Sequence, residues 1–83
     1  MSPKQRAVAR KQILDILDSS GGYLMPVETL LDHLNLVARP PLSLTELDDV
    51  LKRMTADHQI KDVTGGDEIR KIGITDEGQA ARM

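Results

Sequence analysis

The sequence predicts a mainly α-helical domain with a small β-hairpin. Three segments before His58 place apolar residues at the three-to-four residue spacing of an amphipathic helix. Two short β-branched stretches then flank a Gly-Gly-Asp turn, which is typical of a hairpin. Because a chain of 83 residues supports one hydrophobic core, and neither a linker nor an internal repeat interrupts it, we expect a single domain over residues 1–83.

The composition favours an aliphatic core and a reducing compartment. Apolar residues make up 40% of the chain, but Phe and Trp are absent and Tyr23 is the one aromatic residue. The lack of cysteine excludes disulfides, thiolate zinc sites and cysteine nucleophiles. No apolar run has the length of a membrane span or of a secretory signal. We expect a cytoplasmic protein without membrane contact, with the nucleus as the alternative, and the short chain fits a bacterial or phage accessory protein.

The first helix is expected over residues 2–18. Pro3 suits a helix start, because proline at the first helical position gives up no useful N–H group. The apolar stripe of this helix contains Ala9, Ile13, Ile16 and Leu17. Residues 19–22 end it, since glycine accepts the left-handed conformation of a C-terminal cap. Residues 23–25 form the stub of an extended strand, and we expect Tyr23 to anchor the core, stacking on a base being the alternative.

Two further helices are expected on either side of a proline pair. The second runs from Pro26 to about Leu36, and its stripe contains Val27, Leu30, Leu31 and Leu34. Prolines 40 and 41 cannot continue it. The sequence Ser43-Leu44-Thr45-Glu46 predicts a capping box, so the third helix begins at Leu44 and ends near His58. Its buried stripe is predicted to contain Leu44, Leu47, Val50, Leu51 and Met54.

The last third of the chain changes period. Residues 60–64 and 69–74 are predicted strands of a hairpin, and Ile72 and Ile74 share one face of the second strand. Thr75 is a predicted cap for a short final helix with an acidic first turn, over residues 79–82, although Gly78 weakens it.

This order of elements resembles the winged helix-turn-helix family over nearly all of the chain. The most specific part is the stretch from Leu47 to Ala80, where LDDVLKRMTADHQI leads into a wing and IGITDEGQAA closes it. The resemblance implies a three-helix core, a two-stranded wing and a short C-terminal helix. It also implies that residues 43–58 are the recognition helix, 64–68 the wing tip and 26–36 the supporting helix.

The resemblance further implies a small DNA-binding protein, a transcriptional regulator that docks its recognition helix in the major groove. Ser43 and Thr45 would then lie near base edges or phosphate of double-stranded DNA. Positive charge for the backbone phosphates would come from Lys52, Arg53, Arg70, Lys71, Arg6 and Arg10. No cofactor is expected.

The local charge favours a different partner. The recognition helix carries Glu46, Asp48 and Asp49 in its first turns, and the wing tip adds Asp67 and Glu68. Carboxylates repel phosphates, so these residues oppose binding to a duplex. The alternative is a winged-helix protein-interaction module that does not bind DNA and whose acidic residues meet a basic protein surface.

Ion pairing and the charge distribution extend this alternative. Asp48 with Lys52, and Asp49 with Arg53, have the four-residue spacing of helical ion pairs, which would occupy both cations. Residues 1–14 carry a net charge of +4 and residues 15–49 one of −6. A homodimer that joins these opposite charges is one form of the alternative.

Residues for catalysis or metal binding do not form a recognisable pattern. The chain has no nucleophile elbow and no phosphate-binding glycine loop. His33 and His58 are isolated on helices, so neither an enzyme nor a metal site is expected.

Overall fold

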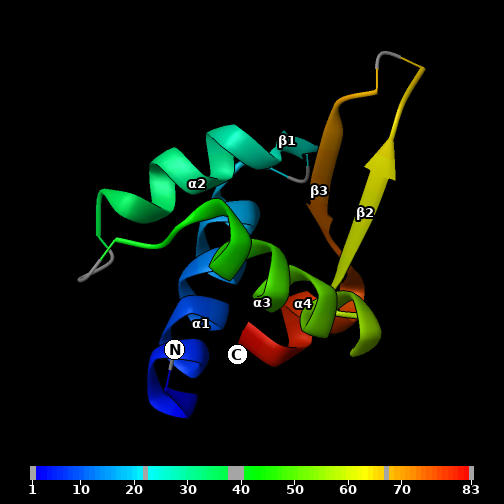
Figure 1. The fold of residues 1–83 in the computed structure, drawn as a ribbon. Helices are drawn as coiled ribbons and strands as arrows, with labels where there is room; N and C mark the ends of the chain where they lie inside the picture. Colours follow the sequence, from blue (N-terminus) through cyan, green and yellow to red (C-terminus); the bar gives the residue numbers. More distant parts are fainter. Residues whose placement is uncertain (1, 22, 38–40, 67, 83) are drawn as a thin grey trace.

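Four helices and three strands follow one another in the computed structural model, which describes residues 2–21, 23–37, 41–66 and 68–82. Their order is α1 (Pro3–Ser19), β1 (Met25–Pro26), α2 (Val27–Asn35), α3 (Leu44–Ala56), β2 (Ile60–Thr64), β3 (Arg70–Ile74) and α4 (Asp76–Arg82). Helix α1 contacts the three other helices and strand β3 (Figure 1). Within the described residues, no helix has both the length and the apolar character of a membrane span.

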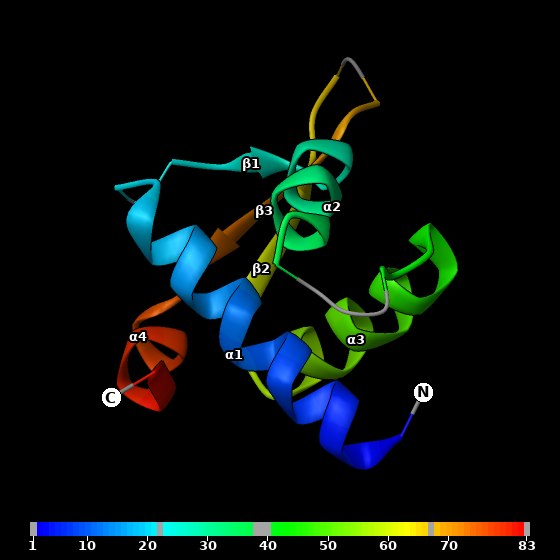
Figure 2. The ribbon, with the colours of Figure 1, turned by 90° about the vertical axis from the view of Figure 1, so that its left-hand side faces the viewer.

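The strands form one antiparallel sheet in the order β1-β3-β2. The predicted hairpin is confirmed, with pairing from Ile60 opposite Ile74 to Thr64 opposite Arg70. The predicted stub also becomes a strand, because Met25 pairs with Ile72, so the wing belongs to a three-stranded sheet rather than standing alone. The far end of the hairpin projects beyond the helices in both views (Figures 1 and 2).

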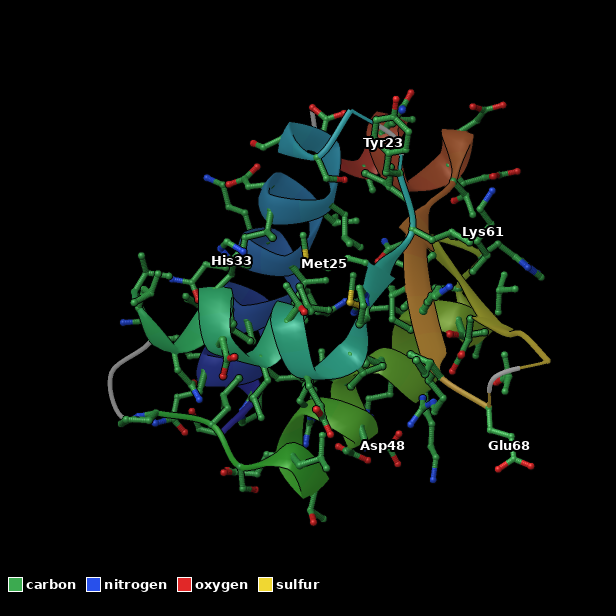
Figure 3. All side chains as sticks on the ribbon, turned by 90° about the horizontal axis from the view of Figure 1, so that it is seen from above. Tyr23, Met25, His33, Asp48, Lys61 and Glu68 are labelled. Atoms are coloured by element: carbon green, nitrogen blue, oxygen red, sulfur yellow. The ribbon has the colours of Figure 1, made fainter. Side chains whose placement is uncertain are left out.

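The core is aliphatic, as the composition predicts. It is filled by Ile13, Leu14 and Leu17 of α1, Val27, Leu30 and Leu34 of α2, Leu47, Val50, Leu51 and Met54 of α3, and Ile60, Ile72 and Ile74 of the sheet. Two predictions of burial are wrong. Leu44 is 50% exposed, because it is the first residue of α3 and its side chain lies at the rim of a surface groove. Tyr23 is 79% exposed, because it lies in the connection before β1, at the edge of the molecule (Figure 3).

Hydrogen-bonded caps fix where the helices begin. The predicted capping box of α3 is confirmed: Ser43 Oγ accepts from the Glu46 amide at 3.2 Å, and Glu46 Oε1 accepts from the Ser43 amide at 3.1 Å. Ser2 and Gln5 form the same arrangement at the start of α1. Each box satisfies backbone N–H groups that have no partner inside the helix.

Local backbone geometry accounts for the helix ends that differ from prediction. Helix α3 stops at Ala56, two residues before the predicted end, and His58 has a left-handed φ of 61° that a helix cannot contain. Helix α2 begins at Val27 rather than Pro26, because Pro26 belongs to β1 and pairs with Lys71 of β3. Asn35 closes the connection to α3 through two hydrogen bonds with the Leu42 backbone, at 2.8 and 3.1 Å.

Glycine 78 has a packing role that the sequence does not reveal. Helix α4 begins at Asp76, and Thr75 Oγ1 accepts from the Gly78 amide at 3.0 Å. A Cβ atom at Gly78 would lie 2.0 Å from the Gln59 carbonyl oxygen. This glycine therefore allows α4 to pack against the start of β2, and it does not merely weaken the helix.

Candidate interaction surfaces

An ion-pair network joins α3 to the wing. Arg70 Nη1 donates to Asp48 Oδ1 at 2.7 Å, and its Nη2 donates to Asp62 Oδ2 at 2.7 Å. Lys52 Nζ lies 3.3 Å from the second carboxylate oxygen of Asp48. The hairpin register makes Asp62 a diagonal neighbour of Arg70 on the face of the sheet that continues from the core. The predicted pair of Asp48 and Lys52 is thus confirmed, but Arg70 is the stronger partner of Asp48.

The network favours the ionised forms of Asp48 and Arg70. The Arg70 guanidinium is the largest cause that lowers the pKa of Asp48 below its ordinary value. Burial opposes this shift, and the Lys52 ammonium lowers the pKa further. In return, Asp62 and then Asp48 raise the pKa of Arg70. Hydrogen bonds from the Ser43 amide and hydroxyl likewise lower the pKa of Glu46. Both pKa shifts favour the charged forms of Asp48 and Glu46.

A groove of about 660 Å³ opens beside this network, between the starts of α2 and α3 and the wing. We call it the acidic groove; it is lined by Pro26, Val27, Glu28, Thr29, Leu44, Thr45, Asp48, Glu68, Ile69 and Arg70. Leu44 and Ile69 are 50% and 46% exposed, so they add apolar surface to the lining of the groove. Asp48 and Glu68 lie on the same side of the molecule, on α3 and on the wing (Figure 3).

The structure divides the predicted DNA contacts between several places. Thr45 and Arg70 line the acidic groove, whereas the Ser43 hydroxyl is used in the capping box. Lys71 alternates with Arg70 along β3 and so lies on the other face of the sheet. Asp67, one of the acidic residues predicted for a protein partner, lies outside the described residues.

The remaining three predicted cations meet on the other side of α3. Arg6 and Arg10 of α1 and Arg53 of α3 line one pocket of about 370 Å³, which we call the arginine pocket; Pro3, Ala7, Ala56 and Asp57 complete it. Arg53 pairs with Asp49 at 3.4 Å, as the four-residue spacing predicts. Arg10 donates to Asp57 Oδ2 at 2.6 Å, a contact across 47 residues for which the sequence gives no signal.

Sequence reasoning misses the apolar residues of the acidic groove. Leu44 is assigned to the core and Ile69 to a strand, since a periodic pattern does not show which apolar residue stays at the surface. Glu28 and Thr29 lie outside the apolar stripe predicted for the second helix, and α2 brings them to the groove. Among the described residues, no three or more His, Asp or Glu side chains gather as metal ligands would.

Comparison with known proteins supports the fold alone. No protein-family model matches the sequence, and no curated protein is significantly similar to it. The crystal structure of a transcriptional regulator of the MarR family from Silicibacter pomeroyi superposes with a TM-score of 0.73 at 20% sequence identity. The match covers 89% of this chain and 45% of that regulator, so this chain spans less than half of its length. The likeness shows that the chain has a winged-helix fold.

Proposed function

We propose that this winged-helix chain is a protein-interaction module whose acidic groove binds a basic, partly apolar surface of a partner protein. The observation that carries this proposal is the state of Arg70, the cation at the junction of α3 and the wing. Two carboxylates hold it at 2.7 Å each. Three of its N–H groups already donate to these carboxylates, and their two negative charges outweigh its single positive charge. A phosphate that approached this guanidinium would meet both carboxylates as well, which removes much of the gain expected from a phosphate contact.

The charge balance around α3 and the wing supports the same partner. Residues 43–71 contain seven Asp and Glu against five Lys and Arg, a net charge of −2. Lys52 is 75% exposed but lies within 3.3 Å of Asp48. Duplex DNA would therefore approach a surface that has no excess of positive charge, whereas Lys and Arg of a protein would be attracted to it.

The apolar side chains that line the groove offer hydrophobic contacts, which DNA uses little. Leu44 and Ile69 are each about half exposed, and burial of the remaining area would contribute about 1 kcal/mol per side chain. Carboxylates at the rim would orient the cations of the partner, while the aliphatic side chains supply most of the affinity. A partner segment with Leu or Ile next to Lys or Arg fits this combination.

Fluorescence anisotropy with two labelled probes tests the proposal. At about 50 mM salt, an amphipathic helical peptide of Leu, Ala and Lys should bind, and a random-sequence DNA duplex should not. The double variant Leu44→Ser with Ile69→Ser should weaken peptide binding about 30-fold. Val8→Ser with Leu36→Ser, which removes exposed apolar side chains outside the groove, is the matched control and should bind as the parent does.

Double-stranded DNA is the second candidate, as for a small DNA-binding transcriptional regulator. It is favoured by Thr45, an exposed residue in the first turn of α3, and by the structural neighbour, which is itself a transcriptional regulator. Tight duplex binding whose affinity falls steeply with salt would support this candidate and would contradict the protein-interaction proposal. A homodimer would instead appear as concentration-dependent sedimentation without any added partner.

A further inference from the structure

The arginine pocket contains a charged group whose hydrogen-bonding capacity is not used. Arg6 Nε is buried and has no hydrogen-bond partner among the described residues, and the carboxylate oxygen with which it pairs, on Asp49, is 4.0 Å away. A buried donor on a charged group is destabilising when it has no acceptor. Folded proteins satisfy such groups with water, an ion or a ligand. The Arg6 guanidinium is therefore poorly satisfied by the described residues, and its side chain, 27% exposed, is in part open to solvent.

The carboxylates near the pocket do not match the arginines in number. Arg10 is well satisfied, because it donates to Asp57 Oδ2 at 2.6 Å and to Gln59 Oε1 at 3.1 Å. Arg6 and Arg53, in contrast, share Asp49, at 4.0 and 3.4 Å. Within the described part of the chain, three guanidinium groups thus face two carboxylates, which leaves one positive charge in excess.

Solvent weakens the ion pairs that both carboxylates form with the arginines. The side chains of Asp49 and Asp57 are each 54% exposed, and exposed ion pairs contribute little free energy. An incoming anion can therefore compete for Arg53 and Arg6 at low cost. The pocket volume of about 370 Å³ leaves space for an oxyanion and for part of the group that carries it.

We propose that the arginine pocket binds a phosphomonoester dianion through Arg6 and Arg53, with Arg10 completing the positive wall. A guanidinium donates two parallel hydrogen bonds to an oxyanion, and two such groups from different helices match the several oxygens of one phosphate. A phosphomonoester offers three terminal oxygens to these donors, whereas a carboxylate offers two. The phosphate of a phosphorylated side chain and that of a nucleotide share this chemistry. The inference is independent of the function proposed for the acidic groove.

Titrations with small phosphates, followed by amide chemical shifts, test the site in the full chain. Inorganic phosphate, O-phosphoserine in a short peptide and adenosine monophosphate should each shift residues of α1 and α3 around the pocket. The dissociation constant should rise at least tenfold in Arg6→Gln and, to a smaller extent, in Arg6→Lys, which keeps the charge but loses the planar fork. Lys4→Gln is the matched control on α1, because Lys4 is exposed and does not line the pocket, and it should change affinity less than twofold.

The outcomes separate specific binding from general attraction. A loss in Lys4→Gln as large as in Arg6→Gln, or full binding by Arg6→Lys, would overturn the proposal, since either result needs charge alone. Competition by duplex DNA at equal phosphate concentration would overturn the monoester assignment. Tighter binding of the phosphopeptide supports a phosphorylated protein as the source, and tighter binding of the nucleotide supports a free metabolite. Binding should also weaken below about pH 6, where the phosphate gains a proton.

Discussion

The two sides of helix α3 use arginine in opposite ways. On the side of the acidic groove, Arg70 binds the carboxylates of both Asp48 and Asp62. On the side of the arginine pocket, Arg6 and Arg53 share the carboxylate of Asp49. Arg70 thus has two carboxylates as partners, whereas Arg6 and Arg53 share one.

Exposure strengthens the contrast. The carboxylates that hold Arg70 are 29% and 27% exposed, whereas the two beside the arginine pocket are 54% exposed. Water screens the second pair of carboxylates more, so each of their ion pairs is weaker. On the groove side the ion pairs are thus better shielded from solvent than on the pocket side.

The largest expected effect is on stability, when one arginine is removed from each side. Arg70→Met should lower the free energy of unfolding by about 1–2 kcal/mol, because it leaves Asp48 and Asp62 without their shared cation. Arg53→Met should cost less than about 0.5 kcal/mol, because it breaks one exposed pair within a helix. Urea unfolding followed by circular dichroism measures both. Equal losses would mean that the two networks do not differ in strength.

A smaller effect is expected in the pH dependence of stability. The pKa of Asp48 is lowered in the folded chain, chiefly by Arg70, so its ionised form stabilises the fold above the ordinary value of 3.8. This contribution is lost as the pH falls through the lower, folded pKa. The parent should therefore exceed Asp48→Asn in unfolding free energy at pH 6 by at most about 1 kcal/mol, and by less at pH 2.5.

The Arg70→Met background provides the control for this pH effect. If Arg70 is the main cause of the lowered pKa, the stability change caused by Asp48→Asn should shrink at pH 6 once Arg70 is absent. An unchanged difference would assign the effect to Lys52 instead. Thermal unfolding at each pH gives the measurement, with the parent, the two single variants and the double variant compared.

Local features of this molecule could be predicted from sequence because their partners are near in the chain. The capping box of Ser43 and Glu46 spans three residues, and the ion pair of Asp49 and Arg53 spans four. Both are confirmed. The helical stripes also predict most of the core correctly, since the spacing of Leu47, Val50 and Leu51 is a property of the helix itself.

Features that depend on distant pairing could not be predicted. Arg10 meets Asp57 across 47 residues, and Arg70 meets Asp48 across 22, and no local pattern encodes either contact. The prediction that Leu44 is buried is wrong for a similar reason. Leu44 has the spacing of a core residue, but its place in the first turn of α3 leaves it half exposed. Both candidate surfaces are therefore products of the tertiary fold, although every charged residue in them is visible in the sequence.

The smallest expected effect comes from neutralising one carboxylate on each side. Asp49→Asn removes the acceptor that Arg6 and Arg53 share, so the arginine pocket should bind inorganic phosphate about two- to threefold more tightly, which corresponds to about 0.5 kcal/mol. Asp48→Asn removes the same charge from the groove side and should leave phosphate affinity at the pocket nearly unchanged, because Asp48 pairs with Arg70 and Lys52, which do not line the pocket. Amide chemical-shift titrations of both variants give the comparison. Equal gains would mean that phosphate responds to the net charge of the chain, and the two sides of α3 would then differ in geometry but not in what they bind.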